Sequence, residues 1–271
     1  MRFVGIDIGG TFTDTVVVDE SGNLQLYKTE STPANPAAGV MEGLKLASEN
    51  LGMTTPELLS DTAYFAHGTT TATNAYIERK GSLTGLITTK GFGDTILMQR
   101  MMGFTAGLTE EQISHYSFRE YPVPIVPHHL IKEVPERVDY KGAVVVNLDQ
   151  EEARRVVREL VEAGVEAIAV CLLWSFRNPE HEQRIKEIIL EEAPDIFVTI
   201  SSELAPVIKE YERSATTCIN AYLAKSVSSY VSKLDTRLRE SRLNGPFLIM
   251  NSIGGSVTAQ EAPNRAVTLL T

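Results

Sequence analysis

The feature that most constrains this chain lies near its start, where a short apolar run ends in an acidic residue and a glycine turn. The segment Gly5–Asp14 reads Gly-Ile-Asp-Ile-Gly-Gly-Thr-Phe-Thr-Asp. Phe3–Ile8 has the apolar composition of a short strand, and a second run rich in β-branched residues begins at Thr13. The sequence therefore predicts two strands joined by a tight glycine turn, with a carboxylate at the end of the first strand.

The turn has the residue types of a phosphate-binding loop. Gly9 and Gly10 let backbone N–H groups approach an anion without a Cβ clash, and Thr11 and Thr13 can donate hydrogen bonds to its oxygens. Asp7 can hold a hydrated Mg²⁺ that bridges those oxygens. The alternative is a hairpin turn that merely contains two glycines, but acid, glycines and hydroxyls at one strand end favour a phosphate loop.

Two other phosphate motifs do not fit this turn. No Gly-Lys-Ser or Gly-Lys-Thr follows the glycines, which excludes the Walker loop. A dinucleotide fingerprint is excluded because the residues after the turn predict a strand, whereas that fingerprint opens a helix.

Apolar periodicity along the rest of the chain predicts an α/β protein. In the first part we expect antiparallel strands, then alternating helices and strands, over residues 3–8, 13–19, 23–29, 36–51 (helix), 62–66, 69–80 (helix) and 83–89. Further along we expect a hairpin, two helix–strand pairs, a long helix and a strand, over residues 131–138 with 142–146, 150–163 (helix), 167–173, 179–192 (helix), 197–201, 205–243 (helix) and 247–250.

This pattern also suggests how the chain is divided. Residues 1–140 are interpreted as an N-terminal lobe, 141–204 as its continuation and 205–271 as the start of a further, truncated domain. Within the first lobe, residues 91–135 contain Pro122, Pro124 and Pro127 and predict a peripheral insertion with little regular structure.

Charge and cysteine content narrow the possible functions. The 271 residues include 25 basic and 35 acidic side chains, and the net charge of −10 disfavours nucleic-acid binding. Cys171 and Cys218 stand beside aliphatic residues without a partner at Cys-x-x-Cys spacing, which indicates core residues and a reducing, cytoplasmic compartment. No apolar run approaches about 18 residues, so we expect no membrane span. The apolar end Leu269–Leu270 is expected to leave unburied surface, or to be covered by further chain or a partner.

Gly5–Asp14 resembles the first phosphate loop of the actin, sugar kinase and Hsp70 superfamily, whose fold is α/β and ribonuclease H-like. More narrowly, the chain resembles the N-terminal part of the hydantoinase A/5-oxoprolinase family, which includes caprolactamase and the ATP-dependent acetone and acetophenone carboxylases. Three further segments carry this narrower resemblance: His67–Ala75, Glu210–Leu223 and Met250–Gly255. The family continues with a second Asp-x-Gly-Gly-Thr loop that is missing here, so the fold is expected to be incomplete and the chain a fragment or a split subunit.

The resemblance implies ATP and Mg²⁺ as cofactors and assigns roles to particular residues. Asp7 is expected to be catalytic and to bind Mg²⁺ through water, and the cofactor-binding residues are Gly9, Gly10, Thr11, Thr13 and Asp14. His67 is expected to be a second catalytic residue that polarises a carbonyl, acts as acid or base, or accepts a phosphoryl group. The residues expected to bind substrate or phosphate are Thr69, Thr70, Asn74 and Arg213.

Two of these residues have structural alternatives. His67 lies where a strand gives way to a helix, where a histidine is also found as a satisfied structural residue. Arg213 shares a helix face with Glu210, so an exposed ion pair three residues apart is the alternative to an anion-binding role.

The function implied is the ATP-binding, substrate-phosphorylating part of an ATP-dependent amidohydrolase that acts on cyclic amides. A ketone carboxylase subunit of the same family is the alternative, followed by a glucokinase-type kinase and a non-catalytic ATPase or nucleotide sensor. The implied partner is a hydantoinase B-like subunit in a hetero-oligomer. Because one phosphate loop is only half of such a site, we expect the isolated chain to bind nucleotide weakly and to hydrolyse essentially none.

Overall fold

The structure is a computed structural model that describes residues 1–32, 35–101, 105, 107–115 and 123–271. The chain folds into two compact units: unit 1 comprises Met1–Gly81 and Leu223–Thr271, and unit 2 comprises Ser82–Tyr222. Helix α9 (Glu210–Glu240) continues from unit 2 into unit 1. These units differ from the segments 1–140, 141–204 and 205–271 because the chain leaves unit 1 at Gly81 and returns to it within a helix.

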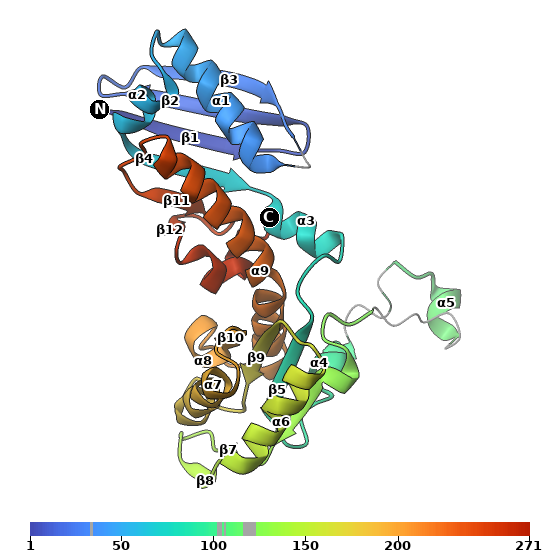
Figure 1. Ribbon diagram of the computed structural model, residues 1–271. Coiled ribbons are helices and arrows are strands. Elements are labelled where there is room, and N and C mark those ends of the chain that lie inside the picture. Colours follow the sequence, from blue (N-terminus) through green and yellow to red (C-terminus); the bar gives the residue numbers. More distant parts are fainter. Residues whose placement is uncertain (33–34, 102–104, 106, 116–122) are drawn as a thin grey trace. The chain divides into compact units, whose positions relative to one another are not determined.

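Unit 1 is built on a six-stranded mixed sheet (Figure 1) with the order β12-β11-β4-β1-β2-β3. The strands are β1 (Arg2–Ile8), β2 (Phe12–Asp19), β3 (Leu24–Glu30), β4 (Thr62–Thr69), β11 (Phe247–Met250) and β12 (Ser256–Thr258). The three antiparallel strands expected at the start of the chain are confirmed. β4 runs parallel to β1, so the carboxyl ends of these two strands lie side by side.

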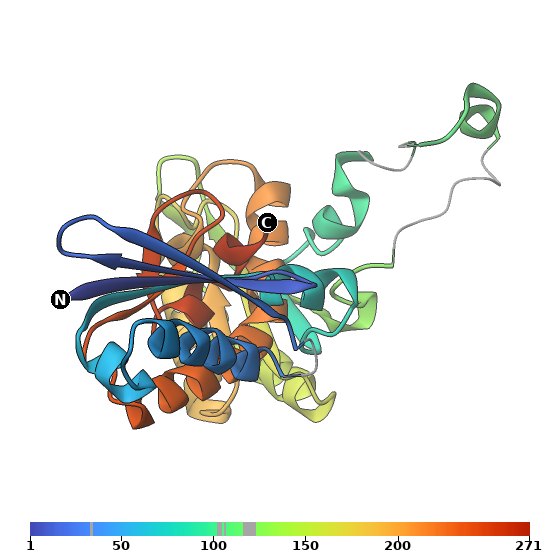
Figure 2. The same ribbon diagram turned by 90° about the horizontal axis from the view of Figure 1, so that it is seen from above.

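A helix covers one face of this sheet. Helix α1 (Pro36–Asn50) begins with proline in its first turn and packs across β1, β2 and β3. Figure 2 views the sheet edge-on and shows α1 on one side of it. Along β1, Val4 and Ile6 are buried whereas Phe3 and Asp7 are exposed. The alternation of a strand therefore separates a covered face, under α1, from an open face.

Short elements complete unit 1. Helix α2 (Thr55–Ser60) starts with a capping box, and the others are helix α3 (Thr71–Ile77) and the 3-10 helix η4 (Ala262–Leu269). The expectation of an unburied apolar end is wrong for Leu269, which is 2% exposed. The Thr271 N–H also donates to Thr73 Oγ1 at 3.0 Å, because the end of the chain packs beside α3.

Unit 2 is a four-stranded parallel sheet with the order β10-β9-β5-β6. The strands are β5 (Thr84–Thr89), β6 (Ile131–Val134), β9 (Ala167–Cys171) and β10 (Phe197–Ile200). The helices are α4 (Thr95–Met98), α5 (Glu110–Ser114), α6 (Gln150–Glu162), α7 (Glu180–Glu192) and α8 (Ser201–Leu204), with 3-10 turns at Gln99–Met101 and His128–Leu130. Every residue of β9 is buried, which places this strand in the core.

The segment 91–135 is not wholly peripheral. Its last part supplies β6, which pairs in parallel with β5, and Val126, Leu130 and Val134 are at most 1% exposed. The expected hairpin of 131–138 with 142–146 is correspondingly shorter, since only β7 (Arg137–Val138) pairs with β8 (Val144–Val146). Residues 102–104, 106 and 116–122 of this segment, including Pro122, lie outside the described residues.

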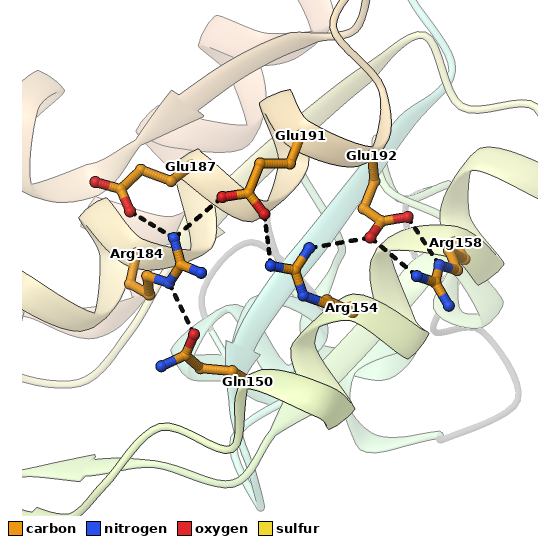
Figure 3. Close-up of polar contacts among 7 residues, drawn as sticks. All are labelled: Gln150, Arg154, Arg158, Arg184, Glu187, Glu191 and Glu192. Atoms are coloured by element: carbon orange, nitrogen blue, oxygen red, sulfur yellow. Dashed lines mark hydrogen bonds and ion pairs between the residues drawn. The ribbon is translucent and has the colours of Figure 1, made fainter.

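Charged side chains join α6 to α7 on the surface of unit 2 (Figure 3). Arg154 pairs with Glu191 and Glu192, and Arg158 also pairs with Glu192. Hydrogen bonds from these two guanidinium groups lower the pKa of Glu192 to about 2. Arg184 extends the network, since it donates to Gln150 and pairs with Glu187 and Glu191. Because all of these groups are accounted for by each other, this network holds two helices together and offers no free charge to a ligand.

Cys171 and Cys218 are both buried and unbridged. Burial raises the pKa of both thiols, which is the behaviour expected of core cysteines. Among the described residues, no helix is both long and apolar enough to cross a bilayer.

Candidate nucleotide site

The turn between β1 and β2 is held by hydrogen bonds that leave its tip open. The Gly9 N–H donates to the Phe12 carbonyl at 2.9 Å. Ser31, the residue after β3, braces the turn: its hydroxyl donates to the Gly9 carbonyl at 2.8 Å and its N–H to the Thr11 carbonyl at 2.9 Å. Gly10 and Thr11 at the tip are exposed, and a Cβ built on Gly10 would meet nothing within 4 Å.

Two carboxylates and a glycine lie beside this turn on the open face of the sheet. In the strand register Asp7 is opposite Asp14 of β2 and Gly68 of β4. Asp14 is paired with Lys28 at 2.9 Å. Among the described residues no donor contacts the exposed Asp7 carboxylate. A Cβ on Gly68 would lie only 2.5 Å from Asp7 Oδ1, so glycine at this position leaves the carboxylate its room.

Thr13 does not fit the phosphate-binding role expected of it. It is fully buried on the covered face, where its hydroxyl is hydrogen-bonded to that of Ser31 at 3.0 Å. Strand alternation is the reason, because the residue between Phe12 and Asp14 must point to the opposite side from Asp14. We therefore leave Thr13 out of the candidate site and regard it as a support for the Ser31 brace.

His67 also differs from the expected acid–base or phosphoryl-accepting residue. It is fully buried on the covered face, opposite to the face that carries Asp7. Nδ1 is 3.1 Å from the Ile6 carbonyl and Nε2 is 2.7 Å from the Tyr230 hydroxyl, so both ring nitrogens are engaged. Burial lowers the pKa of His67 to about 4, which keeps the ring neutral near pH 7. Of the two interpretations, the satisfied structural residue fits this environment.

The burial of His67 predicts a pH dependence of stability. Between about pH 4 and 6.5 the unfolded chain binds a proton on His67 and the folded chain does not, so the free energy of unfolding should rise with pH across this window. The contribution is at most about 3 kcal/mol. Urea unfolding of His67→Asn, which keeps a donor for the Ile6 carbonyl, should show a shallower pH slope than the wild type. Equal slopes would contradict the assignment.

The other candidate residues of the His67–Ala75 segment lie near the turn. Thr69 pairs with Ile8 in the strand register, and Thr70 follows as the residue before α3. Asn74 is exposed and its amide donates to Thr70 Oγ1 at 3.3 Å. Thr69 and Thr70 are half-buried and follow each other at the carboxyl end of β4, beside the carboxyl end of β1. Their predicted role in binding substrate or phosphate remains a prediction.

Arg213 lies in unit 2 and is 1% exposed. Its guanidinium donates to the Leu172 carbonyl at 2.6 Å and to Ser175 Oγ at 3.0 Å, and it stacks on Phe176 with 5.3 Å to the ring centroid. The alternative of an exposed pair with Glu210 is therefore also wrong. Since two donor groups hold the loop after β9, Arg213 reads as a structural residue of unit 2.

This assignment gives a stability prediction. Arg213→Lys keeps the charge but cannot make both hydrogen bonds, so it should lower the free energy of unfolding by about 1–3 kcal/mol in urea unfolding. Arg158→Lys is the matched control, because that arginine is 60% exposed and paired at the surface. A stability change no larger than that of the control would contradict a structural role for Arg213.

Sequence reasoning missed Ser31, Gly68 and Tyr230. Gly68 and Ser31 each carry a faint local signal, since one is a glycine inside a strand and the other a hydroxyl residue just after one. Tyr230 has no such signal, because it is 163 residues away from its partner His67.

The three antiparallel strands, the crossing helix and the parallel return of β4 place unit 1 among α/β proteins of the actin-like ATPase fold class. Residues 3–193 match the hydantoinase/oxoprolinase N-terminal region and residues 213–271 match the hydantoinase/oxoprolinase domain. The chain belongs to the hydantoinase/oxoprolinase family.

Its relatives include subunits of two kinds of enzyme. The chain is 35% identical over 265 residues to the acetophenone carboxylase gamma subunit of Aromatoleum aromaticum, covering 96% of this chain and 36% of that protein. It is 34% identical over 269 residues to the caprolactamase subunit alpha of Pseudomonas jessenii, covering 98% and 38%. The chain therefore spans less than two-fifths of the length of these relatives.

Two solved structures resemble the whole chain. One is nucleotide-free acetone carboxylase, described with ATP-dependent acetone carboxylation, with a TM-score of 0.87 and 34% identity over 100% of this chain and 39% of that one. The other is the ATP-dependent caprolactamase of Pseudomonas jessenii, with a TM-score of 0.86 and 32% identity over 98% and 38%.

Proposed function

We propose that this chain binds the phosphates of Mg-ATP at the β1–β2 turn and serves as the ATP-dependent phosphorylating part of a cyclic-amide hydrolase. The observation that carries the proposal is the exposed Asp7 carboxylate, which has no partner among the described residues and stands beside an open glycine turn. An exposed acid without a partner on a strand end contributes little to packing, which favours a ligand-binding role.

The residues of the turn fit magnesium and phosphate. A Mg²⁺ ion keeps most of its waters and needs only one or two protein carboxylates, and Asp7 can hold it through water. No cluster of three or more acidic, histidine or cysteine ligands occurs among the described residues, so this mode fits better than an all-protein cage. Bound there, the ion would neutralise phosphate charge.

Each residue of the turn then has a distinct task. The backbone at Gly10 and Thr11 offers N–H groups and room for phosphate oxygens, and Gly9 keeps the turn tight because its N–H donates to the Phe12 carbonyl. Asp14 is held by Lys28, which keeps a second carboxylate next to Asp7 without leaving its charge unbalanced. Thr69 and Thr70 are proposed to contact the substrate or the transferred phosphate.

The reaction proposed is transfer of the γ-phosphoryl group of ATP to an oxygen of the substrate, with ADP as the leaving product. A cyclic amide is a poor electrophile until its oxygen carries a good leaving group, and a ketone enolate is lost unless it is trapped on oxygen. Phosphorylation addresses either difficulty. A hydantoinase B-like subunit in a cytoplasmic hetero-oligomer is proposed to complete hydrolysis or carboxylation.

A ketone carboxylase subunit is the second candidate function. The chain is 35% identical to a carboxylase subunit and 34% identical to a caprolactamase subunit, so overall identity does not separate the two. The test is to incubate the complete enzyme with ATP and a panel of 5-oxoproline, hydantoins, lactams and ketones, with and without bicarbonate, while ADP release is measured. Stimulation by a cyclic amide supports the first candidate and bicarbonate-dependent stimulation by a ketone the second; no stimulation would overturn both.

A further inference from the structure

A chain of hydrogen bonds runs beneath the candidate site on the covered face of unit 1. Tyr230, on the part of α9 that belongs to unit 1, is 9% exposed, and its hydroxyl is 2.7 Å from His67 Nε2. Burial raises the pKa of the Tyr230 hydroxyl, and the neighbouring Thr69 side chain lowers it in part. His67 continues the chain to the Ile6 carbonyl, one residue before Asp7.

The Ile6 carbonyl fixes the direction of the hydrogen bonds from Tyr230 through His67. A carbonyl oxygen only accepts, so His67 must carry its proton on Nδ1 and donate to Ile6. Nε2 is then an acceptor, and the Tyr230 hydroxyl donates a hydrogen bond to it. Thr69 Oγ1 is hydrogen-bonded to the Thr71 hydroxyl, 2.8 Å away, and accepts from the Thr71 N–H at 3.2 Å.

We propose that Tyr230 is a positioning residue of the nucleotide site, which ties the end of β1 to the end of β4 and the segment after it through His67. The first of these segments carries Asp7 and leads into the glycine turn, and the second carries Thr69 and Thr70. Nothing else among the described hydrogen bonds joins both segments to a third element through side chains. Tyr230 thus fixes the two segments of the candidate site relative to each other, from the covered face of the sheet.

Burial makes this chain an effective brace. His67 is fully buried and neutral, and burial raises the pKa of Tyr230, so neither group ionises near pH 7. Each group therefore keeps the same role as hydrogen-bond donor or acceptor. Removing the Tyr230 hydroxyl would leave His67 Nε2 as a buried acceptor without a donor. Both segments would then lose their shared anchor, while the tilted ring contact between His67 and Tyr230 would persist.

The test compares Tyr230→Phe with Tyr222→Phe in the 271-residue chain. Tyr222 is 7% exposed on the same helix, and its hydroxyl has no partner among the described residues, so it controls for losing a tyrosine hydroxyl from α9. The inference rests on the proposed function for its ligand, so the first measurement uses no ligand. It records amide hydrogen exchange and amide NMR shifts of the protein without nucleotide. Tyr230→Phe should shift the signals of Asp7–Gly9 and Gly68–Thr71 and speed their exchange, and Tyr222→Phe should not. Unchanged signals in Tyr230→Phe would overturn the inference.

Nitrogen NMR of the His67 ring supplies a signature that a loss of packing would not give. The wild type should show the Nδ1–H tautomer with a hydrogen-bonded Nε2, and Tyr230→Phe should keep the tautomer but shift Nε2 to the value of an unbonded nitrogen. A wild type with the proton on Nε2 would overturn the inference.

Binding of Mg-ADP separates this inference from the proposed function. Tyr230→Phe should weaken binding roughly 10-fold, the effect of one buried hydrogen bond, whereas Tyr222→Phe should bind like the wild type. If the wild type binds Mg-ADP and Tyr230→Phe binds it equally well, the inference alone is overturned. If the wild type binds no nucleotide, the proposed function is overturned, and the hydrogen-exchange result then decides whether Tyr230 positions the two segments. If Tyr230→Phe fails to fold, the nitrogen NMR spectrum of His67 in the wild type decides the inference.

Discussion

Replacement of Asp7 by alanine should reduce ATP-dependent turnover of the complete enzyme by about 100-fold or more, with little change in melting temperature. The reason is that the Asp7 carboxylate is exposed and no described residue contacts it, so the fold does not depend on it, whereas a magnesium-bound nucleotide would. The measurement is ADP release under saturating substrate, beside thermal unfolding of both proteins.

Glu42→Ala is the matched control for Asp7→Ala. Glu42 is an exposed carboxylate of the same unit, but it lies on α1, on the other side of the sheet. This variant should keep wild-type turnover. If Asp7→Ala kept turnover in a well-folded enzyme, the β1–β2 turn would not be the magnesium site.

The second large effect is expected at Gly10. Gly10→Val should raise the apparent KM for ATP by about 10-fold or more and change the melting temperature little. A Cβ on Gly10 meets no protein atom within 4 Å, so the added side chain occupies the space proposed for a phosphate instead of straining the turn. The measurement is the ATP dependence of ADP release.

Gly5→Val controls for adding the same side chain at a nearby glycine outside the turn, within β1. A Cβ on Gly5 also meets nothing within 4 Å, and Gly5 lies two residues before Asp7 within β1. This variant should leave the KM for ATP close to that of the wild type. If Gly10→Val had the same KM for ATP as the wild type, the phosphates would have to bind elsewhere.

Much of the fold could be predicted because its elements carry strong local signals. The glycine turn after Phe3–Ile8 and the helix that begins at Pro36 are written in consecutive residues, and both are found as expected. The long helix predicted over 205–243 is confirmed as α9 over Glu210–Glu240. In contrast, the parallel pairing of β6 with β5 could not be predicted, because Thr84–Thr89 and Ile131–Val134 are separated by a long proline-containing segment.

The candidate site was predicted in part, and its errors have two physical causes. Thr13 was assigned by its residue type, although the alternation of a strand that exposes Asp14 must bury Thr13. His67 and Arg213 were assigned by motif, whereas their burial depends on partners distant in sequence, such as Tyr230 and Leu172. A residue pattern identifies which side chains could do chemistry, but long-range packing decides which of them stay accessible.

The central claim is that nucleotide phosphates bind at the β1–β2 turn, and backbone NMR of the 271-residue chain titrated with Mg-ATP tests it most directly. Weak binding suffices for this measurement, because fast exchange reports the site from shift changes alone. The account predicts that the largest changes fall on the amides of Gly9, Gly10 and Thr11, next to Asp7, and that they disappear in Asp7→Ala. Changes confined to other residues, or none at all at millimolar nucleotide, would contradict it.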